Sequence, residues 1–344
     1  MATCINVTQM KRAFGLLFLV ALMALTATAD TPVALDIASF ATHQHFETSD
    51  EVLNVAVSQA GKRIAISLPN NRIIIMRLTD GKTIAEFKYQ GTDSHRMKFS
   101  SDGELLFSRN VKAALFNNPP ALVTVWRIQD QKLLLSTHPD LIGNFGVDLR
   151  LGKVHCADFS PEGKTVVFGA LDENTPLCLL DLEAKKITPI KHDKCGYVAD
   201  LTFSGDGKRI IAFAMKGPNS DNVMTLIIRT EDNSRKVVEI PENMRFVGFD
   251  RDQILMAERK DDQFVISDLQ TKKIVNRIKA DSLGNALLCR QSQILFDGKN
   301  FWDISKNTAS VLFTLPDSSE SSAADEDTIV TANRKKAVDV WRLK

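Results

Sequence analysis

The histidines and carboxylates that could hold a metal ion are few and widely separated in this chain. His43 and His45 flank a single residue, so on a β-strand both imidazoles would lie on the same side. A metal ion would need further ligands from elsewhere. The pair is therefore interpreted as solvated, with a metal site as the alternative.

A second candidate site for a metal ion is an acidic segment near the C-terminus. Glu320 and residues 325–327 are acidic and lie among serines without the regular spacing of a calcium loop. A solvated acidic loop is the favoured interpretation, and calcium binding is the alternative.

The sequence patterns of common enzymes are absent. There is no G-x-S-x-G nucleophile elbow, no Walker loop, no H-E-x-x-H and no Rossmann glycine pattern. We therefore expect no catalytic residues, no metal ion and no cofactor.

The cysteines that follow the N-terminal segment match no paired metal-binding motif. They are Cys156, Cys178, Cys195 and Cys289. Three of them lie on or beside expected strands, where a free thiol behaves as a small apolar side chain. Buried thiols are the favoured interpretation. If a disulfide forms instead, Cys178 and Cys195 are the closest pair in sequence.

A phrase that recurs along the chain reveals the elements that must position these side chains. It reads Phe99-Ser-Ser-Asp-Gly-Glu, Phe159-Ser-Pro-Glu-Gly-Lys and Phe203-Ser-Gly-Asp-Gly-Lys, each between two alternating apolar runs. Glycine after an acidic residue reverses the chain where φ is positive, and each phenylalanine is expected to pack between sheets. Gly163 and Gly207 lie 44 residues apart. A period in the low forties with several strands per repeat is typical of a β-propeller.

Seven groups of short β-rich runs are expected. Six cover residues 52–89, 95–136, 154–191, 198–240, 245–278 and 285–315, and a seventh follows residue 315. The seventh group is one strand short, and an open ring would expose two unpaired strand edges. We predict that the run Val33–Phe40 supplies the missing outer strand by pairing with Ala337–Leu343. The two ends of the chain would then close the ring.

The pattern resembles the WD40-repeat family, including its bacterial secreted members, over nearly all of residues 30–344. The resemblance rests on the recurring phrase and on third-strand endings such as Trp126-Arg127, Trp302-Asp303 and Trp341-Arg342. All three tryptophans fall at that position, so we expect them to pack between adjacent sheets rather than bind a ligand. The Gly-His pair that the family favours before each repeat is absent. The resemblance implies an all-β, seven-bladed, WD40-like β-propeller.

Three of the longest connections are expected on one face of the propeller. They cover residues 110–122, 138–153 and 215–222, and strand order sends all three to the same side of blades two to four. Aromatic and arginine side chains on loops are typical of binding surfaces, and tolerated insertions are the alternative. The candidate binding residues on these connections are Lys112, Phe116, Asn117, Asn118, Phe145, Asp148, Arg150 and Lys216.

Residues 1–29 have the pattern of a secretory signal peptide. Lys11-Arg12 precede an apolar run from Ala13 to Leu25 and the exit Thr26-Ala-Thr-Ala29. The run is shorter than the about 20 residues that a membrane-crossing helix needs. We expect cleavage before Asp30 and an exported, periplasmic or secreted protein with no membrane span after cleavage. The 43 basic and 42 acidic residues nearly cancel, which gives no electrostatic footprint for nucleic acid.

The function that the resemblance implies is non-catalytic. We expect an exported, monomeric scaffold or recognition module that binds a protein or peptide through the loop face of the propeller, although fold alone does not fix function. The alternative is a propeller enzyme, or a carbohydrate or small-molecule binder, that uses the central channel. Asp158 and Asp200 lie on expected innermost strands and could face that channel together, but no partner base or metal motif accompanies them.

Overall fold

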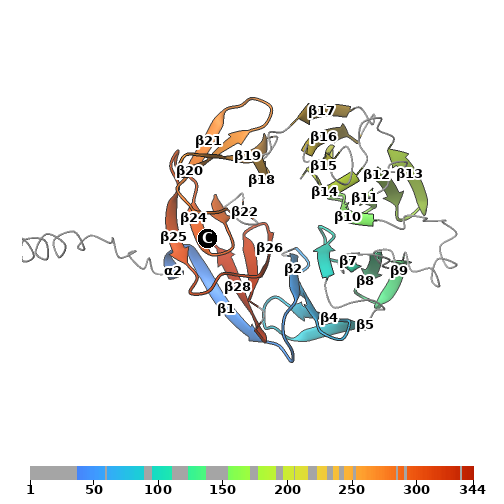
Figure 1. Ribbon diagram of the computed structural model, residues 1–344. Coiled ribbons are helices and arrows are strands. Elements are labelled where there is room, and N and C mark those ends of the chain that lie inside the picture. The colour runs from blue at the N-terminus through green and yellow to red at the C-terminus, as the bar shows by residue number, and fades with distance from the viewer. Residues whose placement is uncertain are drawn as a thin grey trace, which may run out of the picture. The chain divides into compact units, whose positions relative to one another are not determined.

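The computed structural model describes residues 37–344 except for residues 59, 89–94, 111–122, 137–153, 171–176, 191–196, 205, 216–222, 231–234, 240–243, 251–252, 284–285, 290–292 and 334. Within this unit, antiparallel strands form seven four-stranded sheets arranged as the blades of a β-propeller (Figure 1). The expected all-β, seven-bladed architecture is confirmed. Among the described residues, no helix combines the length and the apolar character that crossing a membrane requires.

Each of the first six blades is built from four consecutive strands, ordered from the innermost outward, and neighbouring strands within a blade are antiparallel. Blade 1 contains β2 (Asn54–Ser58), β3 (Arg63–Leu68), β4 (Arg72–Arg77) and β5 (Thr83–Lys88). Blade 2 contains β6 (His95–Phe99), β7 (Leu105–Asn110), β8 (Val123–Arg127) and β9 (Lys132–Ser136). Blade 3 contains β10 (Val154–Phe159), β11 (Thr165–Ala170), β12 (Leu177–Asp181) and β13 (Lys186–Ile190). Blade 4 contains β14 (Tyr197–Phe203), β15 (Arg209–Met215), β16 (Val223–Arg229) and β17 (Arg235–Glu239).

The remaining blades follow the same order until the last one. Blade 5 contains β18 (Met244–Asp250), β19 (Gln253–Lys260), β20 (Gln263–Asp268) and β21 (Ile274–Ile278). Blade 6 contains β22 (Leu287–Cys289), β23 (Ile294–Phe296), β24 (Asn300–Asp303) and β25 (Ser310–Thr314). Blade 7 contains β26 (Ser321–Asp325), β27 (Thr328–Ala332), β28 (Ala337–Leu343) and, as its outer strand, β1 (Ala41–Glu47).

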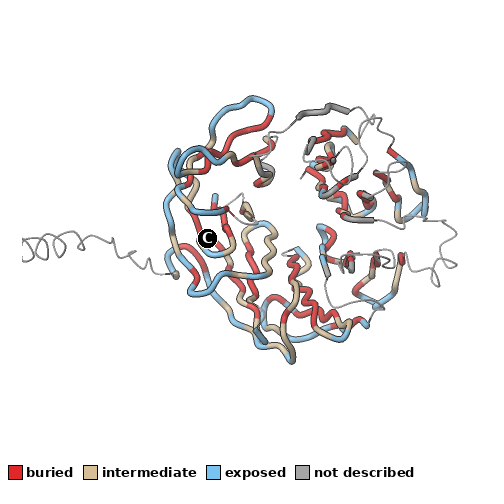
Figure 2. Tube along the Cα trace, viewed as in Figure 1, coloured by how far each residue is buried: buried red, intermediate tan, exposed pale blue. Residues whose placement is uncertain are grey.

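The core is divided among the contacts between neighbouring blades. Seven clusters of buried apolar side chains occur among the described residues, and each joins one blade to the next around the ring. Buried residues accordingly follow the strands, while exposed ones gather at turns and along outer strands (Figure 2). Burial of apolar area is the main driving force for packing, so every blade depends on both of its neighbours.

The recurring phenylalanines and the tryptophans occupy the expected places. Phe99, Phe159 and Phe203 are buried, and each packs against the preceding blade. Trp302 and Trp341 are also buried and lie in the clusters that join blades 5 to 6 and 6 to 7. The three tryptophans are therefore structural. Trp126 is half-buried, and its ring stacks on Phe87 of blade 1 with 5.0 Å between the ring centroids.

Both ends of the described chain contribute to blade 7, which closes the ring, but the predicted closing segment is wrong. The N-terminal partner of β28 is β1, with Ala41 opposite Leu343 and Glu47 opposite Ala337. Of the predicted run Val33–Phe40, residues 37–40 form the short helix α2 (Ile37–Phe40), and residues 33–36 lie outside the described residues. The prediction that a strand near the N-terminus closes the ring is thus confirmed, but the closing strand is Ala41–Glu47 instead of Val33–Phe40.

The physical reason for this difference is that the outermost strand of a blade pairs with only one neighbouring strand and therefore needs little apolar surface. The strand β1 alternates between more buried and exposed positions, with Ala41 buried and Phe46 half-buried. Its polar side chains also hold it in place. The His43 ring stacks on Trp341 with 4.2 Å between the ring centroids. Phe40, from the more apolar predicted run, instead packs into the cluster between blades 6 and 7.

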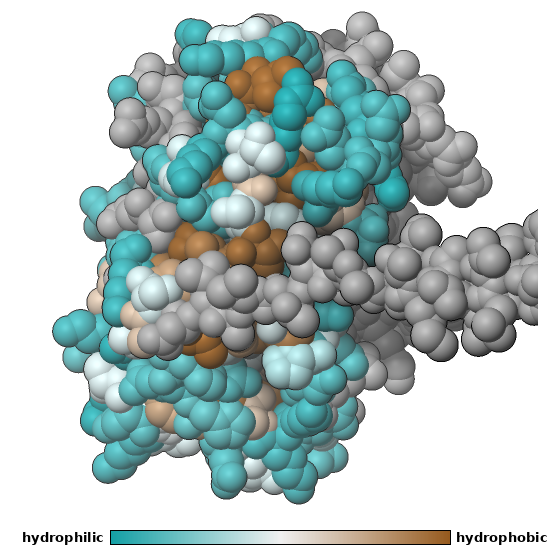
Figure 3. Space-filling model, turned by 90° about the vertical axis from the view of Figure 1, so that its left-hand side faces the viewer, coloured by the Kyte–Doolittle hydropathy of each residue, from teal (hydrophilic) through white to brown (hydrophobic). Residues whose placement is uncertain are grey.

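The surface beside the ring closure is predominantly hydrophilic. Figure 3 shows apolar residues there as separate patches among hydrophilic ones. Three large apolar side chains count as exposed among the described residues, and each belongs to the outermost strand of a blade. They are Ile84, Ile274 and Val311. No broad apolar surface emerges from these residues, and the polar features of the molecule are the better guide to function.

Candidate functional site

The two faces of the propeller follow from strand order. The phrase turns after Phe99, Phe159 and Phe203 lie on one face, named here the turn face. The strands β7, β9 and β15 end on the opposite face, named the loop face. All eight candidate binding residues belong to the connections that follow these strands, and they lie outside the described residues. They are Lys112, Phe116, Asn117, Asn118, Phe145, Asp148, Arg150 and Lys216.

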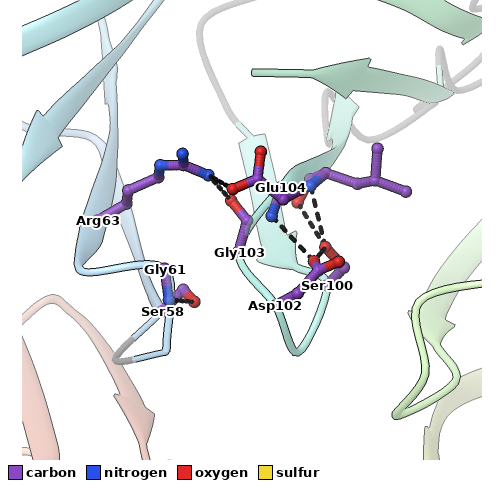
Figure 4. A network of polar contacts seen from close by, with 8 residues as sticks. Ser58, Gly61, Arg63, Ser100, Asp102, Gly103 and Glu104 are labelled. Carbon is purple, nitrogen blue, oxygen red and sulfur yellow. Dashed lines mark hydrogen bonds and ion pairs between the residues drawn. The ribbon is translucent and has the colours of Figure 1, made fainter. Parts of the chain in front are cut away.

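The turn face is built from a repeated hydrogen-bond pattern (Figure 4). In blade 2 the Ser100 hydroxyl donates to Asp102 Oδ1 at 2.6 Å and accepts the Leu105 N–H at 2.9 Å. Asp102 Oδ1 also accepts the Glu104 N–H at 2.9 Å, and the Gly103 N–H donates to the Ser100 carbonyl at 2.9 Å. The glycine has a φ of 71°, which explains why the phrase requires glycine there.

Blade 4 reproduces the same geometry. Ser204 donates to Asp206 Oδ1 at 2.5 Å and accepts the Arg209 N–H at 2.9 Å, and Gly207 has a φ of 71°. The bond from Ser204 is the main cause that lowers the pKa of Asp206, with Lys208 contributing further and partial burial opposing it. This pattern satisfies the backbone of the turn, so the turn residues serve the fold.

Neighbouring turns also contact one another across the blade boundary. Arg63 of blade 1 donates to the Gly103 carbonyl and forms an ion pair with Glu104 at 3.0 Å (Figure 4). A Cβ atom placed on Gly103 would lie 2.6 Å from the Cα atom of Gly61, closer than atoms of this kind approach. The turn face is therefore packed backbone against backbone between blades 1 and 2.

A large cavity occupies the centre of the propeller. Its volume is about 1760 Å³, and residues of the inner strands of several blades line it. The charged lining residues of blades 2 and 4 are Arg96, Lys98, Arg109 and Asp200. Further charged lining residues in blades 5 to 7 are Arg259, Asp262, Lys279, Asp281, Asp297, Lys299 and Glu320. The central channel is thus polar and wide enough for more than a small molecule, because ligand pockets typically measure about 300–1,000 Å³.

Equivalent positions on the inner strands of blades 2, 3 and 4 carry different chemistry. The residue three positions before the phrase phenylalanine is Arg96 in blade 2, Cys156 in blade 3 and Asp200 in blade 4. Together with Arg109 these residues influence one another electrostatically. A cation, a thiol and an anion therefore meet at one level of the channel, near the loop face.

Arg109 is the unusual member of this group because it is charged and buried, with 6% of its surface exposed. Burial is the first cause that lowers the pKa of Arg109 to about 10, and the positive charge of Arg96 is the second, while Asp200 acts in the opposite direction. The Arg109 guanidinium therefore remains charged near neutral pH. The sequence analysis did not single out either arginine. The available signal was Arg109 itself, the one charged residue of the strand Leu105-Leu-Phe-Ser-Arg-Asn.

The Cys156 thiol is buried and donates to the Val198 carbonyl at 3.7 Å. Burial, followed by the charge of Asp200, raises the pKa of this thiol, so it is neutral at physiological pH and poorly nucleophilic. Cys156, Cys178 and Cys289 are all buried, as expected. Cys195, the other member of the alternative pair with Cys178, lies outside the described residues.

The positions one residue before the phrase phenylalanine form a chain of contacts across three blades. Lys98 Nζ of blade 2 forms an ion pair with Asp158 Oδ1 of blade 3 at 2.6 Å. Asp158 Oδ2 accepts the Thr202 hydroxyl and the Phe203 N–H of blade 4, each at 2.9 Å. Asp158 is buried and does not line the channel, whereas Asp200 does. The expectation that both carboxylates face the channel together is therefore wrong for Asp158, which joins blades instead.

The other candidate metal ligands have ordinary contacts. His43 and His45 lie on the same side of β1, as their spacing predicts, and both contact Asp339. His43 Nε2 and His45 Nδ1 lie 2.8 and 2.9 Å from Asp339 Oδ1. Among the described residues, no group of three or more histidine, cysteine, aspartate or glutamate side chains is arranged to hold a metal ion.

Comparisons with known proteins support the fold. No protein-family model matches the chain, and no curated protein matches it. In contrast, 1666 chains of solved structures match it. One belongs to a crystal structure of the mitotic checkpoint complex, with a TM-score of 0.59 and 15% sequence identity over 92% of this chain and 96% of that chain. At this identity the similarity shows a shared WD40-like propeller fold.

Proposed function

We propose that this chain is an exported, non-catalytic recognition module that binds a protein or peptide over the loop face of blades 2 to 4. The observation that carries the proposal is that two independent features coincide there. The strands β7, β9 and β15 end at that face, and the charged residues Arg96, Arg109 and Asp200 line the channel at the same end of blades 2 and 4.

The candidate residues have complementary roles in this proposal. Phe116 and Phe145 act as apolar anchors, which usually dominate the affinity of an interface. Lys112, Arg150 and Lys216 form a charged rim around them, and rims of this kind are polar and accessible to solvent. Asn117, Asn118 and Asp148 supply hydrogen bonds to the backbone of the partner.

The body of the propeller suits this role because it is rigid. Each blade packs against its neighbours through an apolar cluster, and the turn face is fixed by repeated hydrogen bonds. A rigid support lowers the entropy that is lost when a partner binds. The similar propeller of known structure belongs to the mitotic checkpoint complex, which supports a partner-binding role.

One observation favours a second candidate function. The central channel has a charged lining, and convergent polar groups of this kind orient a carbohydrate or small-molecule ligand. A small molecule that remains with the purified chain in native mass spectrometry would favour this alternative.

The experiment for the first proposal compares the two faces directly. Partners are captured with the purified chain from the envelope fraction of the exporting cell, identified, and purified for affinity measurements. The Phe116→Ala/Phe145→Ala variant is expected to weaken binding by about tenfold or more. The matched control is Lys164→Gln/Lys208→Gln on the turn face, with unchanged affinity expected. Loss of binding in the control, with affinity and fold kept in the loop variant, would place the site on the other face.

A further inference from the structure

The wall of the central channel changes character at blades 4 and 5. Phe213 of β15 and the β18 residues Met244 and Phe246 line the cavity, and each of these large apolar side chains is half-buried. They pack on a buried apolar cluster that joins the two blades. These three channel residues are named here the apolar corner. Part of their apolar surface faces the channel, beyond what the contact between blades 4 and 5 buries.

The repeat shows that the fold does not require an aromatic ring at the position of Phe213. In blade 4 this residue lies opposite Asp200 in the strand register. The corresponding pairs of blades 1, 2 and 3 are Asn54 with Ser67, Arg96 with Arg109, and Cys156 with Gly169. A serine, an arginine and a glycine thus occupy the position where blade 4 has phenylalanine. The ring therefore does not perform a structural task that every blade shares.

Two aromatic rings from neighbouring blades meet at an angle in the apolar corner. The ring centroids of Phe213 and Phe246 lie 5.3 Å apart, and the ring planes are tilted by 48°. Met244 lies two positions before Phe246 on β18, so both side chains point to the same side of the strand. Its unbranched thioether adapts to apolar partners of different shape. Tilted rings beside a flexible side chain can contact one apolar group on more than one side.

The apolar corner lies at the loop-face end of the channel. Met244 is the first residue of β18, which begins at that face. Phe213 lies two positions before the end of β15, which ends at the same face. A chain segment that docks on the loop face therefore needs to insert only one side chain to reach the corner.

The border of the apolar corner restricts the kind of ligand that fits it. Asp200 lies directly opposite Phe213, and Arg96 lines the same channel. Both charged side chains are exposed. A lipid chain is apolar along its whole length and would cover these charges without offering them partners, which is costly. A peptide segment carries polar backbone groups on both sides of an apolar side chain, so it matches an apolar corner with a charged border.

We propose that the apolar corner binds one large apolar side chain of the peptide segment that docks on the loop face. Removal of apolar surface from water drives this contact, and side chains that fill a pocket near the centre of an interface usually dominate its affinity. Asp200 and Arg96 contact the polar groups of the segment beside this side chain. The inference rests on the proposed function, because it names a kind of side chain that the bound segment must carry.

The test uses the full purified chain with three probes: the capped tripeptides Gly-Phe-Gly and Gly-Gln-Gly, and decanoate as a short lipid chain. Affinity is measured by ligand-observed NMR, and folding by thermal unfolding. One test variant is Met244→Gln, which keeps the side-chain length, and the other is Phe213→Ser, which copies Ser67 of blade 1. The matched control is Ile274→Gln, on the outermost strand of blade 5. Gly-Phe-Gly is expected to bind the unmodified chain and the control equally, and both test variants about fivefold more weakly.

Several results would overturn the inference. They are a Gly-Phe-Gly affinity no higher than that of Gly-Gln-Gly, an unchanged Gly-Phe-Gly affinity in a folded test variant, or loss of the fold in both test variants. Tighter binding of decanoate than of Gly-Phe-Gly, weakened in the same variants, would reassign the corner to a lipid chain. The Phe116→Ala/Phe145→Ala variant separates the two proposals. If it keeps partner binding while Gly-Phe-Gly binding depends on the corner, the loop anchors fail and the corner stands. If it loses partner binding while the corner variants bind Gly-Phe-Gly normally, the reverse holds.

Discussion

The two ends of the inner hairpin of blade 2 are built on opposite principles. At the turn face, Ser100 and Asp102 satisfy the backbone of the turn with hydrogen bonds of 2.6 to 2.9 Å. At the loop end, Arg96 and Arg109 place two positive charges opposite each other. The turn end repeats with nearly the same geometry in blade 4. The fold requires the hydrogen bonds of the turn end, whereas it does not require two opposed arginines at the loop end. The loop end is therefore the better place to look for function.

The same contrast appears across neighbouring blades. The phrase glycines of blades 2, 3 and 4 have φ values of 71°, 70° and 71°, so the turn positions are interchangeable. Three residues before the phrase phenylalanine, the same blades carry Arg96, Cys156 and Asp200. A repeat protein keeps identical residues where each copy performs the same structural task. Different residues at equivalent positions leave the channel asymmetric, as recognition of one particular ligand requires.

The largest effect is expected at the turn face, from Gly103→Ala. The new Cβ would need a φ of 71° and would lie 2.6 Å from both Gly61 Cα and Ser58 Oγ. We expect the free energy of unfolding to fall by about 3 kcal/mol, from backbone strain and overpacking together. The control is Gly163→Ala, with a φ of 70° but a nearest contact of 3.4 Å, for which strain alone predicts about 1 kcal/mol. Urea unfolding measures both, and equal losses would show that the turns of blades 1 and 2 do not pack tightly.

The next effect concerns the contact chain between blades 2, 3 and 4. Asp158→Ala leaves the Phe203 N–H without its acceptor and removes the partner of Lys98. We expect a loss of about 2 kcal/mol in unfolding free energy, below the cost of breaking a fully buried pair, because the Lys98 side chain is 49% exposed. Lys98→Met is the second single variant. The double variant is expected to lose less than the two single losses combined, and strict additivity would contradict the ion pair.

A smaller, pH-dependent effect is expected for Ser204→Ala. The hydroxyl is the main cause that lowers the pKa of Asp206 in the folded protein. Stability from this carboxylate is therefore complete above its unfolded pKa of about 3.9 and is lost as pH falls through the lower folded pKa. The variant is expected to lose about 1 kcal/mol at pH 7, and its difference from the unmodified chain should narrow toward pH 3. Urea unfolding across this range measures the narrowing, and a constant difference would contradict it.

The architecture could be predicted from the sequence because its signals are local and repeated. Asp-Gly and Glu-Gly after a buried phenylalanine specify a turn wherever they occur, and three copies establish the period. The same repeat placed all three tryptophans at the end of a third strand, and their packing between blades followed from that position. The closing strand could not be placed correctly, because an edge strand needs little apolar surface. Apolar content favoured Val33–Phe40, while the stacking of His43 on Trp341 helps to hold Ala41–Glu47 in place.

The channel site was only partly predictable. Asp200 was expected to face the channel and does so, but Asp158 at a different repeat position turns into the blade boundary. Alignment of the three phrases would have separated the two, because Asp158 aligns with Lys98 and Asp200 aligns with Arg96. The pairing of Arg96 with Arg109 depends on strand register, which a sequence pattern does not fix for a strand flanked by a long connection. The eight candidate residues on the loop-face connections remain predictions.

The smallest expected effect compares two pairs of cations that lie opposite each other on neighbouring strands, Arg96 with Arg109 in the channel and Arg72 with Lys88 on the outer strands of blade 1. In Arg96→Gln the repulsion of Arg109 disappears, so the free energy of unfolding is expected to rise by about 0.5 kcal/mol at low salt. In Lys88→Gln no rise is expected, because Lys88 also attracts Glu86, which pairs with Arg72. Salt sharpens the comparison. The Debye length falls from about 10 Å at 0.1 M to about 3 Å at 1 M, so the gain in Arg96→Gln should shrink as salt is added. A gain in both variants, or a loss in Arg96→Gln at low salt, would show that repulsion between Arg96 and Arg109 does not set the channel pair apart from the outer one.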